Sequence, residues 1–322
     1  MSRRAIIIDT DPGQDDAIAI LTALGSPEAV EILGICAVAG NVPLPLTLDN
    51  VRKLLELAGR RDVPVYAGAE APLTRSLVTA EHVHGMTGLD GHEFPPPTMP
   101  VQGQHAAAFI VEAVMSRPPR SVTICALGPA TNLALALALE PRIAGRLREI
   151  VWMGGAAIEG GNVTPASEFN VHVDPEAGVK LLASGAALVM MPLDVTHKAR
   201  VTHAWMDEVK AIGGPTGTAL GNLMTFAKGA DELKFGKDRS PLHDPTTVAY
   251  VLRPELFEGQ HVNVEIETGG QFTRGMTVVD WWGVSGRPAN VTFMREIDAQ
   301  GFFALLTQAL RRLAADLADS GR

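Results

Sequence analysis

Four aspartates stand close together near the N-terminus of this chain. They belong to the segment Asp9-Thr10-Asp11-Pro12-Gly13-Gln14-Asp15-Asp16, which follows an apolar run over residues 5–8. Carboxylates packed against a buried strand repel one another unless a cation neutralises them, and an all-oxygen ligand set suits a hard ion such as Ca²⁺ or Mg²⁺. A simpler interpretation is that Asp15 and Asp16 only favour the start of a helix. Four acids together favour a metal site over that interpretation.

A second polar cluster follows the apolar run Ile150 to Met153. Its glycines let backbone approach a ligand closely, and its polar side chains supply acceptors and amide donors. These side chains are Asn162, Glu168, Asn170 and Asp174. Such groups suit a polyhydroxylated ligand. The alternative is a loop that caps the helix after Asp174, which explains Asp174 but neither Glu168 nor Asn170.

A third cluster is Leu242-His243-Asp244-Pro245. Asp244 before Pro245 is by itself a plausible helix N-cap, and a lone histidine beside it is more often structural than catalytic. This cluster therefore indicates a functional site only in combination with the other two clusters.

Taken together, the three clusters resemble the motifs of the inosine-uridine nucleoside hydrolases. The segment from Asp9 to Ala17 is similar to the N-terminal signature of that family. The remaining motifs follow in the order of the family: Ala39-Gly40-Asn41, His84-Gly85, Leu127-Gly128-Pro129-Ala130-Thr131-Asn132, Met153-Gly154-Gly155, Glu168-Phe169-Asn170, Asp174-Pro175-Glu176-Ala177, His243-Asp244-Pro245 and Thr273-Arg274-Gly275. The resemblance implies a Ca²⁺-dependent hydrolase that cleaves the N-glycosidic bond of free ribonucleosides to base and ribose. It also implies a place in nucleoside salvage and purine or pyrimidine catabolism, and a homo-oligomer, either dimer or tetramer.

The resemblance also assigns roles to matching residues. The ligands of Ca²⁺ would be Asp11, Asp16, Asp244 and the backbone carbonyl of Leu127. Asp11 would be the general base toward a metal-bound water, which attacks the sugar C1′ from the face opposite the base, as an inverting hydrolysis requires. The residues that bind ribose would be Asp15, Asn41, Met153, Asn162, Glu168 and Asn170.

Recognition of the leaving base is less defined. His243 and His84 match two histidine positions near the base, and an imidazole has a suitable pKa for protonating it. The aromatic and polar residues of pyrimidine-preferring relatives are not evident over residues 222–235, where Gly229 takes the place of an aromatic. Candidate stacking partners are Phe226, Phe235, Trp281 and Trp282, although such residues more often belong to a core. Purine or pyrimidine preference, and which histidine protonates the base, stay open at this point.

Two rival functions use the same residues. A phosphatase of the haloacid-dehalogenase kind would use Asp9 or Asp11 as its nucleophile, but its additional Lys and acidic motifs are not apparent. A non-catalytic ribose or nucleoside sensor would keep the hydroxyl-binding residues and lose base or metal ligands, all of which are present here. The hydrolase is therefore the favoured function.

The elements that position these residues follow from hydrophobic periodicity. Short apolar runs alternate with helical segments, which predicts an α/β fold: an open, mostly parallel, Rossmann-like sheet with helices on both faces. We expect strands near 5–8, 32–38, 122–127, 150–153 and 188–191, with helices near 15–24, 47–58, 131–139 and after Asp174. Residues 68–100 form a long functional loop. Runs at 262–267 and 276–279 predict a small antiparallel addition before a final helix at 302–317.

Composition excludes several other classes. The chain has 322 residues, of which 46% are hydrophobic and 20% charged, with a formal net charge of -9. This composition is globular, and the negative charge disfavours nucleic-acid binding. No apolar stretch matches a signal peptide or the ~18 residues of a membrane span. Cys36 and Cys125 lie in apolar runs and are expected to be buried reduced thiols. We therefore expect a cytoplasmic protein with one domain, residues 1–322, whose partner is a small-molecule ribonucleoside.

Overall fold

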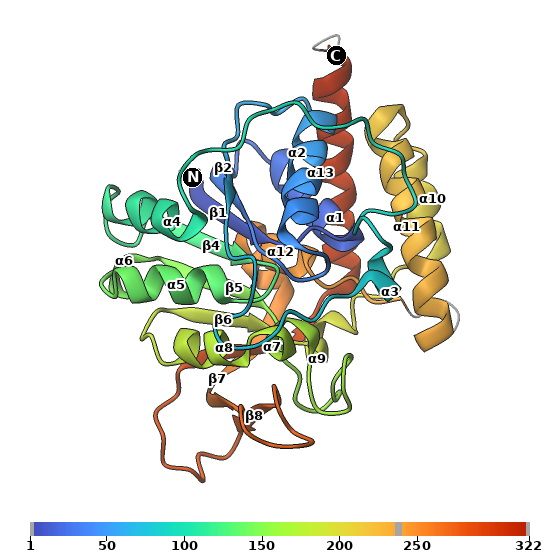
Figure 1. The fold of residues 1–322 in the computed structure, drawn as a ribbon. Helices are drawn as coiled ribbons and strands as arrows, with labels where there is room; N and C mark the ends of the chain where they lie inside the picture. The colour runs from blue at the N-terminus through green and yellow to red at the C-terminus, as the bar shows by residue number, and fades with distance from the viewer. Residues whose placement is uncertain (1–2, 236–239, 320–322) are drawn as a thin grey trace.

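The computed structural model describes residues 3–235 and 240–319 (Figure 1). The described residues form a nine-stranded sheet in the order β3-β2-β1-β4-β5-β6-β9-β7-β8. Its strands are β1 (Arg4–Thr10), β2 (Val30–Ala37), β3 (Val65–Ala67), β4 (Val122–Ala126), β5 (Glu149–Met153), β6 (Leu188–Met191), β7 (Phe257–Ile266), β8 (Thr277–Asp280) and β9 (Val291–Ile297).

The first six strands pair in parallel, and β1 lies between β2 and β4. The chain therefore builds the sheet outward from β1 in both directions. At the far edge β9 runs parallel to β6 and antiparallel to β7, and β8 pairs antiparallel with β7. The predicted parallel sheet with a small antiparallel addition is confirmed. Two strands were not predicted: β3, at the edge beside β2, and β9, which joins the two parts.

Helices cover both faces of the sheet. They are α1 (Gln14–Leu24), α2 (Leu44–Leu57), α3 (Glu81–His84), α4 (Ala106–Met115), α5 (Thr131–Leu139), α6 (Ile143–Arg146), α7 (Phe169–Val173), α8 (Pro175–Leu182), α9 (Leu193–Thr196), α10 (His203–Lys210), α11 (Gly214–Phe235), α12 (Pro245–Leu252) and α13 (Ala299–Asp319), with a 3-10 turn at Pro254–Leu256. The helices predicted at 15–24, 47–58, 131–139, after Asp174 and at 302–317 are α1, α2, α5, α8 and α13. Helices α4 and α12 were not predicted. The long connection at 68–100 contains only the single-turn helix α3 among its described residues.

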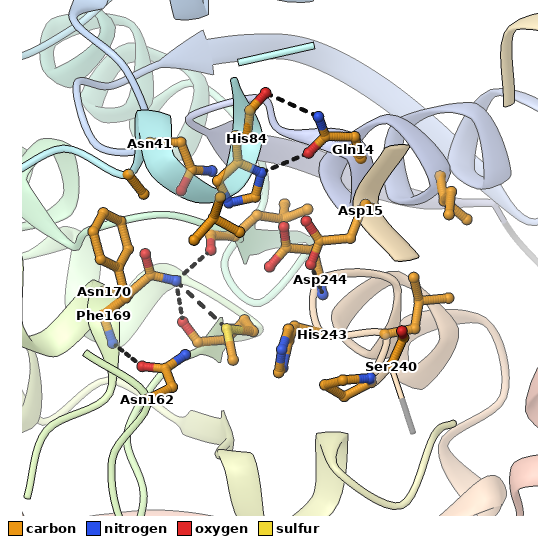
Figure 2. Close-up of a pocket in the computed structure, with 18 of the residues that line it drawn as sticks. Gln14, Asp15, Asn41, His84, Asn162, Phe169, Asn170, Ser240, His243 and Asp244 are labelled. Carbon is orange, nitrogen blue, oxygen red and sulfur yellow. Dashed lines mark hydrogen bonds between the residues drawn. The ribbon is translucent and has the colours of Figure 1, made fainter. Parts of the chain in front are cut away.

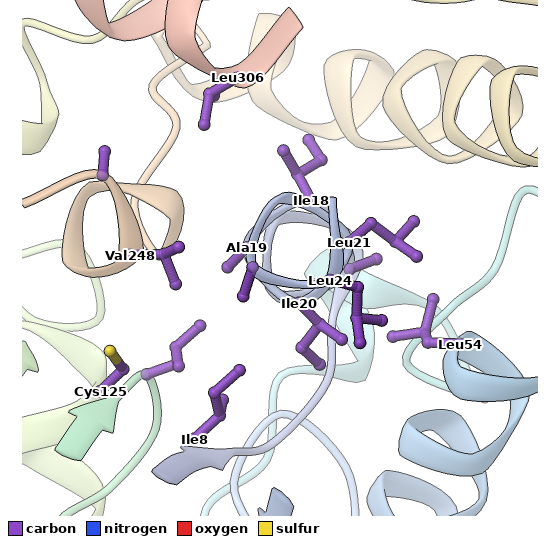
Figure 3. Close-up of a cluster of buried hydrophobic side chains, with 14 of the residues drawn as sticks. Ile8, Ile18, Ala19, Ile20, Leu21, Leu24, Leu54, Cys125, Val248 and Leu306 are labelled. Carbon is purple, nitrogen blue, oxygen red and sulfur yellow. The ribbon is translucent and has the colours of Figure 1, made fainter. Parts of the chain in front are cut away.

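Two apolar cores hold these layers together. One lies under α1, α2, α11, α12 and α13, and Figure 3 shows part of it around Ile18, Leu54 and Leu306. The other lies under α4, α5 and α8. Along β1, Ile6 and Ile8 enter the first core while Ile7 enters the second. Burial on both faces explains why this strand reads as an uninterrupted apolar run.

Both cysteines lie inside these cores. Cys36 and Cys125 are buried free thiols, as predicted. Burial raises the pKa of the Cys125 thiol to about 12, which makes it unreactive. Among the described helices, none has the length and apolar character that crossing a bilayer requires.

Candidate functional site

A cavity of about 420 Å³ opens at the carboxyl ends of the parallel strands. Asp11 follows β1, Leu127 follows β4, and Met153 is the last residue of β5. This edge lies where the chain departs from β1 in two directions, and ligands of open α/β sheets bind at such a switch point. Residues of α11 and the segment 240–244 close the opposite wall.

Nearly all residues predicted for the site line this cavity (Figure 2). They are Asp11, Asp15, Asn41, His84, Leu127, Met153, Asn162, Glu168, Asn170, His243 and Asp244. Asp16 does not line it, because its side chain is fully buried. The topology thus gathers side chains from distant parts of the sequence at one place.

Three carboxylates form a cluster able to hold a cation. Oxygen atoms of Asp15, Asp16 and Asp244 all lie within 4.8 Å of one another. Burial, followed by the charge of Asp15, raises the pKa of Asp16 to about 6 and that of Asp244 well above its usual range. A hard cation fits this set, because it can neutralise the charges of three carboxylates held this close together.

Asp16 also has the structural role of the simpler interpretation. The backbone N–H of Gly13 donates to its Oδ2 at 2.8 Å, and Thr10 donates to its Oδ1 at 2.5 Å. Asp16 thus caps the start of α1 while facing the cluster. Asp244 occupies the N-cap position of α12, as its sequence context suggested, but its side chain makes no cap hydrogen bond. Helix capping therefore explains one role of the Asp16 carboxylate and does not explain the Asp244 carboxylate.

Asp11 has hydrogen-bond partners of its own, and its carboxylate also feels the charges of Asp16 and Asp15. Asn41 donates its backbone N–H to Asp11 Oδ2 at 2.8 Å, and its side-chain amide donates to the Asp11 carbonyl at 3.0 Å. Gly128 lies against the other carboxylate oxygen so closely that a Cβ there would stand 2.3 Å from Oδ1. Burial raises the pKa of Asp11 well above its usual range, and the charge of Asp16 adds to this. A raised pKa suits a carboxylate that accepts a proton.

The second polar cluster forms another wall. Asn170 donates its amide to the carbonyl of Leu127 at 2.6 Å and to that of Met153 at 3.1 Å. The Asn162 side chain accepts from the backbone of Phe169 at 2.9 Å. These contacts tie the loop after β5 to the ends of β4 and β5.

Glu168 and Asp174 each cap a helix. Asp174 caps α8, as expected, by accepting from Ala177 N at 3.0 Å. Glu168 likewise caps α7, because its carboxylate accepts from the backbone of Asn170 and Val171, and it also accepts from Gly155. Capping of the helix after Asp174 does not involve Glu168, as expected, but Glu168 has a capping role at α7 that the sequence analysis missed. Burial still raises its pKa to about 7.

The two predicted histidines line the cavity from different elements, and His82 of α3, which was not predicted, also lines it. His84 comes from α3, and its Nδ1 lies 2.7 Å from Oε1 of Gln14. His243 precedes α12, and its Nδ1 lies 2.8 Å from the hydroxyl of Thr196. The His197 ring lies 5.8 Å from that of His243, centroid to centroid.

Among the candidate stacking residues, none with a described side chain lines the cavity. Phe226 lies in a separate cavity beside His92, Trp281 packs against Phe293, and Trp282 is exposed. The side chain of Phe235 lies outside the described part, and Gly229 is exposed on α11. The wall is lined instead by residues that the sequence analysis missed: Gln14, Phe169, Met224, Ala227 and Lys228.

Lys228 is the most distinctive of these missed residues. It is buried on α11, and its ammonium lies 2.9 Å from Nδ1 of His203. One signal could have found it, since a lysine spaced four residues from Met224 shares that face of the helix.

Comparison with known proteins places this geometry among related chains. The family model described as "Inosine-uridine preferring nucleoside hydrolase" matches residues 6–304. An uncharacterized protein of Schizosaccharomyces pombe is 47% identical, covering 96% of this chain and 99% of the relative. The pyrimidine-specific ribonucleoside hydrolase RihA of Enterobacter sp. is 44% identical, covering 96% and 98%. The solved purine-preferring ribonucleoside hydrolase from Gardnerella vaginalis has a TM-score of 0.91 at 30% identity, covering 97% and 99%.

Proposed function

The chain belongs to the family of inosine-uridine preferring nucleoside hydrolases and is a hydrolase of ribonucleoside N-glycosidic bonds, and we propose that it acts by inversion with one bound Ca²⁺. The observation that carries this proposal is the convergence of Asp15, Asp16 and Asp244 beside Asp11 at the carboxyl edge of the sheet. The products are free base and ribose.

Asp11, Asp16, Asp244 and the carbonyl of Leu127 would hold the cation. Their oxygen atoms suit Ca²⁺, which accepts 6 to 8 such ligands in flexible geometry. When bound, the ion supplies positive charge that orients a water and ribose hydroxyls and makes that water more acidic. The Leu127 carbonyl has a second lone pair besides the one used by Asn170. We assign Asp15 to ribose because it is partly exposed and lines the cavity, whereas Asp16 does not.

Asp11 acts as the general base. Its carboxylate takes a proton from the attacking water, and Asn41 holds it in place during the transfer. The water then adds to C1′ from the face opposite the base, which inverts the configuration. A positioned general base contributes about 10² to 10⁴-fold in rate.

The ribose hydroxyls contact Asp15, Asn41, Asn162, Glu168 and Asn170, and Met153 packs beside the sugar. A deoxyribonucleoside leaves part of this polar set unpaired and therefore binds poorly. His243 protonates the leaving base. Lys228 offers only donors, which suit carbonyl oxygens of the base. Proteins similar to this chain carry names that specify pyrimidine and purine substrates, so the ribose is the common element of the substrate class.

A panel of substrates tests the function. Uridine, cytidine, inosine, adenosine and guanosine, each with its 2′-deoxy counterpart, are incubated with the Ca²⁺-loaded enzyme, and reducing sugar and free base are measured. We expect equal amounts of both products from ribonucleosides and little from deoxyribonucleosides. Phosphate release from nucleotides without free base would instead support the phosphatase, and binding without turnover the sensor.

We further propose that the protein works in the cytoplasm, in nucleoside salvage and purine or pyrimidine catabolism. Residues 1–322 would fold as one domain and assemble as a homo-oligomer, a dimer or tetramer. Light scattering coupled to gel filtration measures the assembly directly, and a monomer at micromolar concentration would contradict it.

A further inference from the structure

The side-chain amide of Gln14 makes three hydrogen bonds to the loop that carries His84. Its Nε2 donates to the carbonyl oxygens of His84 at 3.0 Å and Asp90 at 3.2 Å. Its Oε1 lies 2.7 Å from Nδ1 of His84 (Figure 2). Carbonyl oxygens only accept, so the amide cannot be flipped without placing Oε1 against both of them. The backbone therefore fixes which end of Gln14 faces the imidazole.

The orientation of Gln14 determines the tautomer of His84. An amide oxygen only accepts, so the hydrogen between Oε1 and Nδ1 belongs to the histidine. A neutral imidazole carries one N–H, which leaves a lone pair on Nε2. Burial lowers the pKa of His84, with the charge of His82 acting in the same direction and that of Asp15 opposing it. The neutral form is therefore the one that Gln14 holds.

The same segment shows why the ring can sit there. A Cβ on Gly13 would stand 2.4 Å from Nδ1 of His84, closer than side chains approach one another. Only glycine at this position lets the imidazole pack against the turn before α1. Figure 2 shows the His84 ring between Asn41 and Asp15, beside the groups assigned to ribose.

We propose that Gln14 is a positioning residue that holds His84 as the Nδ1–H tautomer, so that His84 meets the nucleoside as a hydrogen-bond acceptor through Nε2. The part that concerns the nucleoside rests on the proposed function. The partner of Nε2 is a substrate N–H or O–H: the imide N–H of a uracil, the lactam N–H of a hypoxanthine, or a ribose hydroxyl. A histidine in this state has no proton on Nε2 to donate, so protonation of the leaving base falls to His243.

The tautomer is measured without substrate. Long-range ¹H–¹⁵N correlation spectra of uniformly ¹⁵N-labelled enzyme at about pH 7.5 distinguish the two neutral tautomers, and His84→Ala identifies the signals of His84. We expect a protonated Nδ1 and an unprotonated Nε2. An Nε2–H pattern in the wild type would overturn the proposal and would leave the hydrolase assignment untouched.

Two variants of Gln14 separate its acceptor from its donors. Gln14→Glu keeps an oxygen opposite Nδ1, so Nδ1 should stay protonated, but its carboxylate favours the charged imidazolium and the variant loses the donors to the carbonyls of His84 and Asp90. Gln14→Met removes the acceptor, so His84 should become a mixture of tautomers. Gln271→Met, on an exposed surface, is the control. Thermal melts and Ca²⁺ titrations verify that each variant is folded and binds metal. An unchanged His84 spectrum in a folded Gln14→Met enzyme would overturn the role of Gln14.

Kinetics test what Nε2 contacts. Loss of one neutral hydrogen bond predicts a KM for uridine or inosine about three- to tenfold higher in Gln14→Met, with kcat changed much less. Nitrophenyl riboside has no base N–H. If its KM is unchanged in Gln14→Met, Nε2 contacts the base of the nucleoside. If its KM rises as much as that of the nucleosides, Nε2 contacts the ribose. If His84→Ala lowers kcat about 10²-fold for inosine alone, His84 is the proton donor and the proposal is wrong.

Discussion

Asn41 binds Asp11 at two points, through its backbone N–H to Oδ2 at 2.8 Å and through its side-chain amide to the backbone carbonyl at 3.0 Å. One residue thereby fixes both the carboxylate and the main chain that carries it. Such double restraint would keep Asp11, the proposed general base, within the narrow geometry that proton transfer requires.

Asp11→Asn tests the general base. The amide keeps an oxygen in place but cannot accept the proton, so kcat should fall by about 10² to 10⁴-fold while nucleoside binding changes much less. Steady-state kinetics and equilibrium binding of a ribonucleoside measure the two effects. An unchanged kcat would transfer the base role to another group, most plausibly Asp15.

Gly128→Ala tests the position of the Asp11 carboxylate. The new Cβ would stand 2.3 Å from Oδ1, so the carboxylate must shift, and a displacement near 1 Å costs about 10²-fold in rate. Gly103→Ala is the matched control, because open space surrounds that glycine. Wild-type kcat in a folded Gly128→Ala enzyme would show that this contact does not position Asp11.

Removal of the metal should abolish turnover. Asp16→Ala or Asp244→Ala should weaken Ca²⁺ binding, because each substitution removes a carboxylate from a cluster whose charges need a cation. Calorimetric titration measures the affinity, with Asp207→Ala on the exposed face of α10 as control. Full activity in a preparation shown by elemental analysis to lack metal would refute the site.

His243→Ala tests protonation of the leaving base. A purine or pyrimidine leaves poorly as an anion, whereas a nitrophenolate leaves without being protonated. The substitution should therefore slow the hydrolysis of inosine or uridine by about 10²-fold and barely change the hydrolysis of nitrophenyl riboside. Equal slowing of both substrates would mean that His243 positions ribose or Asp244 instead.

Glu168 gives a pH dependence of stability. Burial raises its pKa from 4.5 to about 7 in the folded protein, so the folded state binds more protons than the unfolded state between these values. The stabilisation is complete below pH 4.5 and is lost as pH rises to about 7, a change of about 3 kcal/mol. Unfolding in urea at several pH values should show a flatter profile for Glu168→Gln. Parallel profiles for the two proteins would contradict this assignment.

The sequence predicted the parallel part of the fold because its strands are buried on both faces. Uninterrupted apolar runs such as Leu188–Met191 distinguish them from their surroundings. Strand β9 has no such mark, since Thr292, Arg295 and Glu296 interrupt the apolar residues of Val291–Ile297, and its place between β6 and β7 is decided by tertiary pairing. Helix α4 is apolar almost throughout, so it lacks the amphipathic period that identifies a helix.

The same distinction applies to the site. Asp11 was predictable from its place at the carboxyl end of the first strand, whereas Leu127 and Met153 were assigned through the family resemblance. The contribution of Gln14 was not predictable, since it depends on how the 68–100 loop folds back over that edge. No local spacing encodes such a contact.

The contact between Asp244 and Asp15 joins residues 229 positions apart. During translation Asp15 leaves the ribosomal exit tunnel early. Asp244 leaves it only after most of the polypeptide has done so. Until then the turn that carries Asp15 and Asp16 lacks Asp244. A cation therefore cannot stabilise the nascent chain by binding the complete cluster. The first apolar core likewise needs α12 and α13, so the core and the acidic cluster are both completed late in biosynthesis.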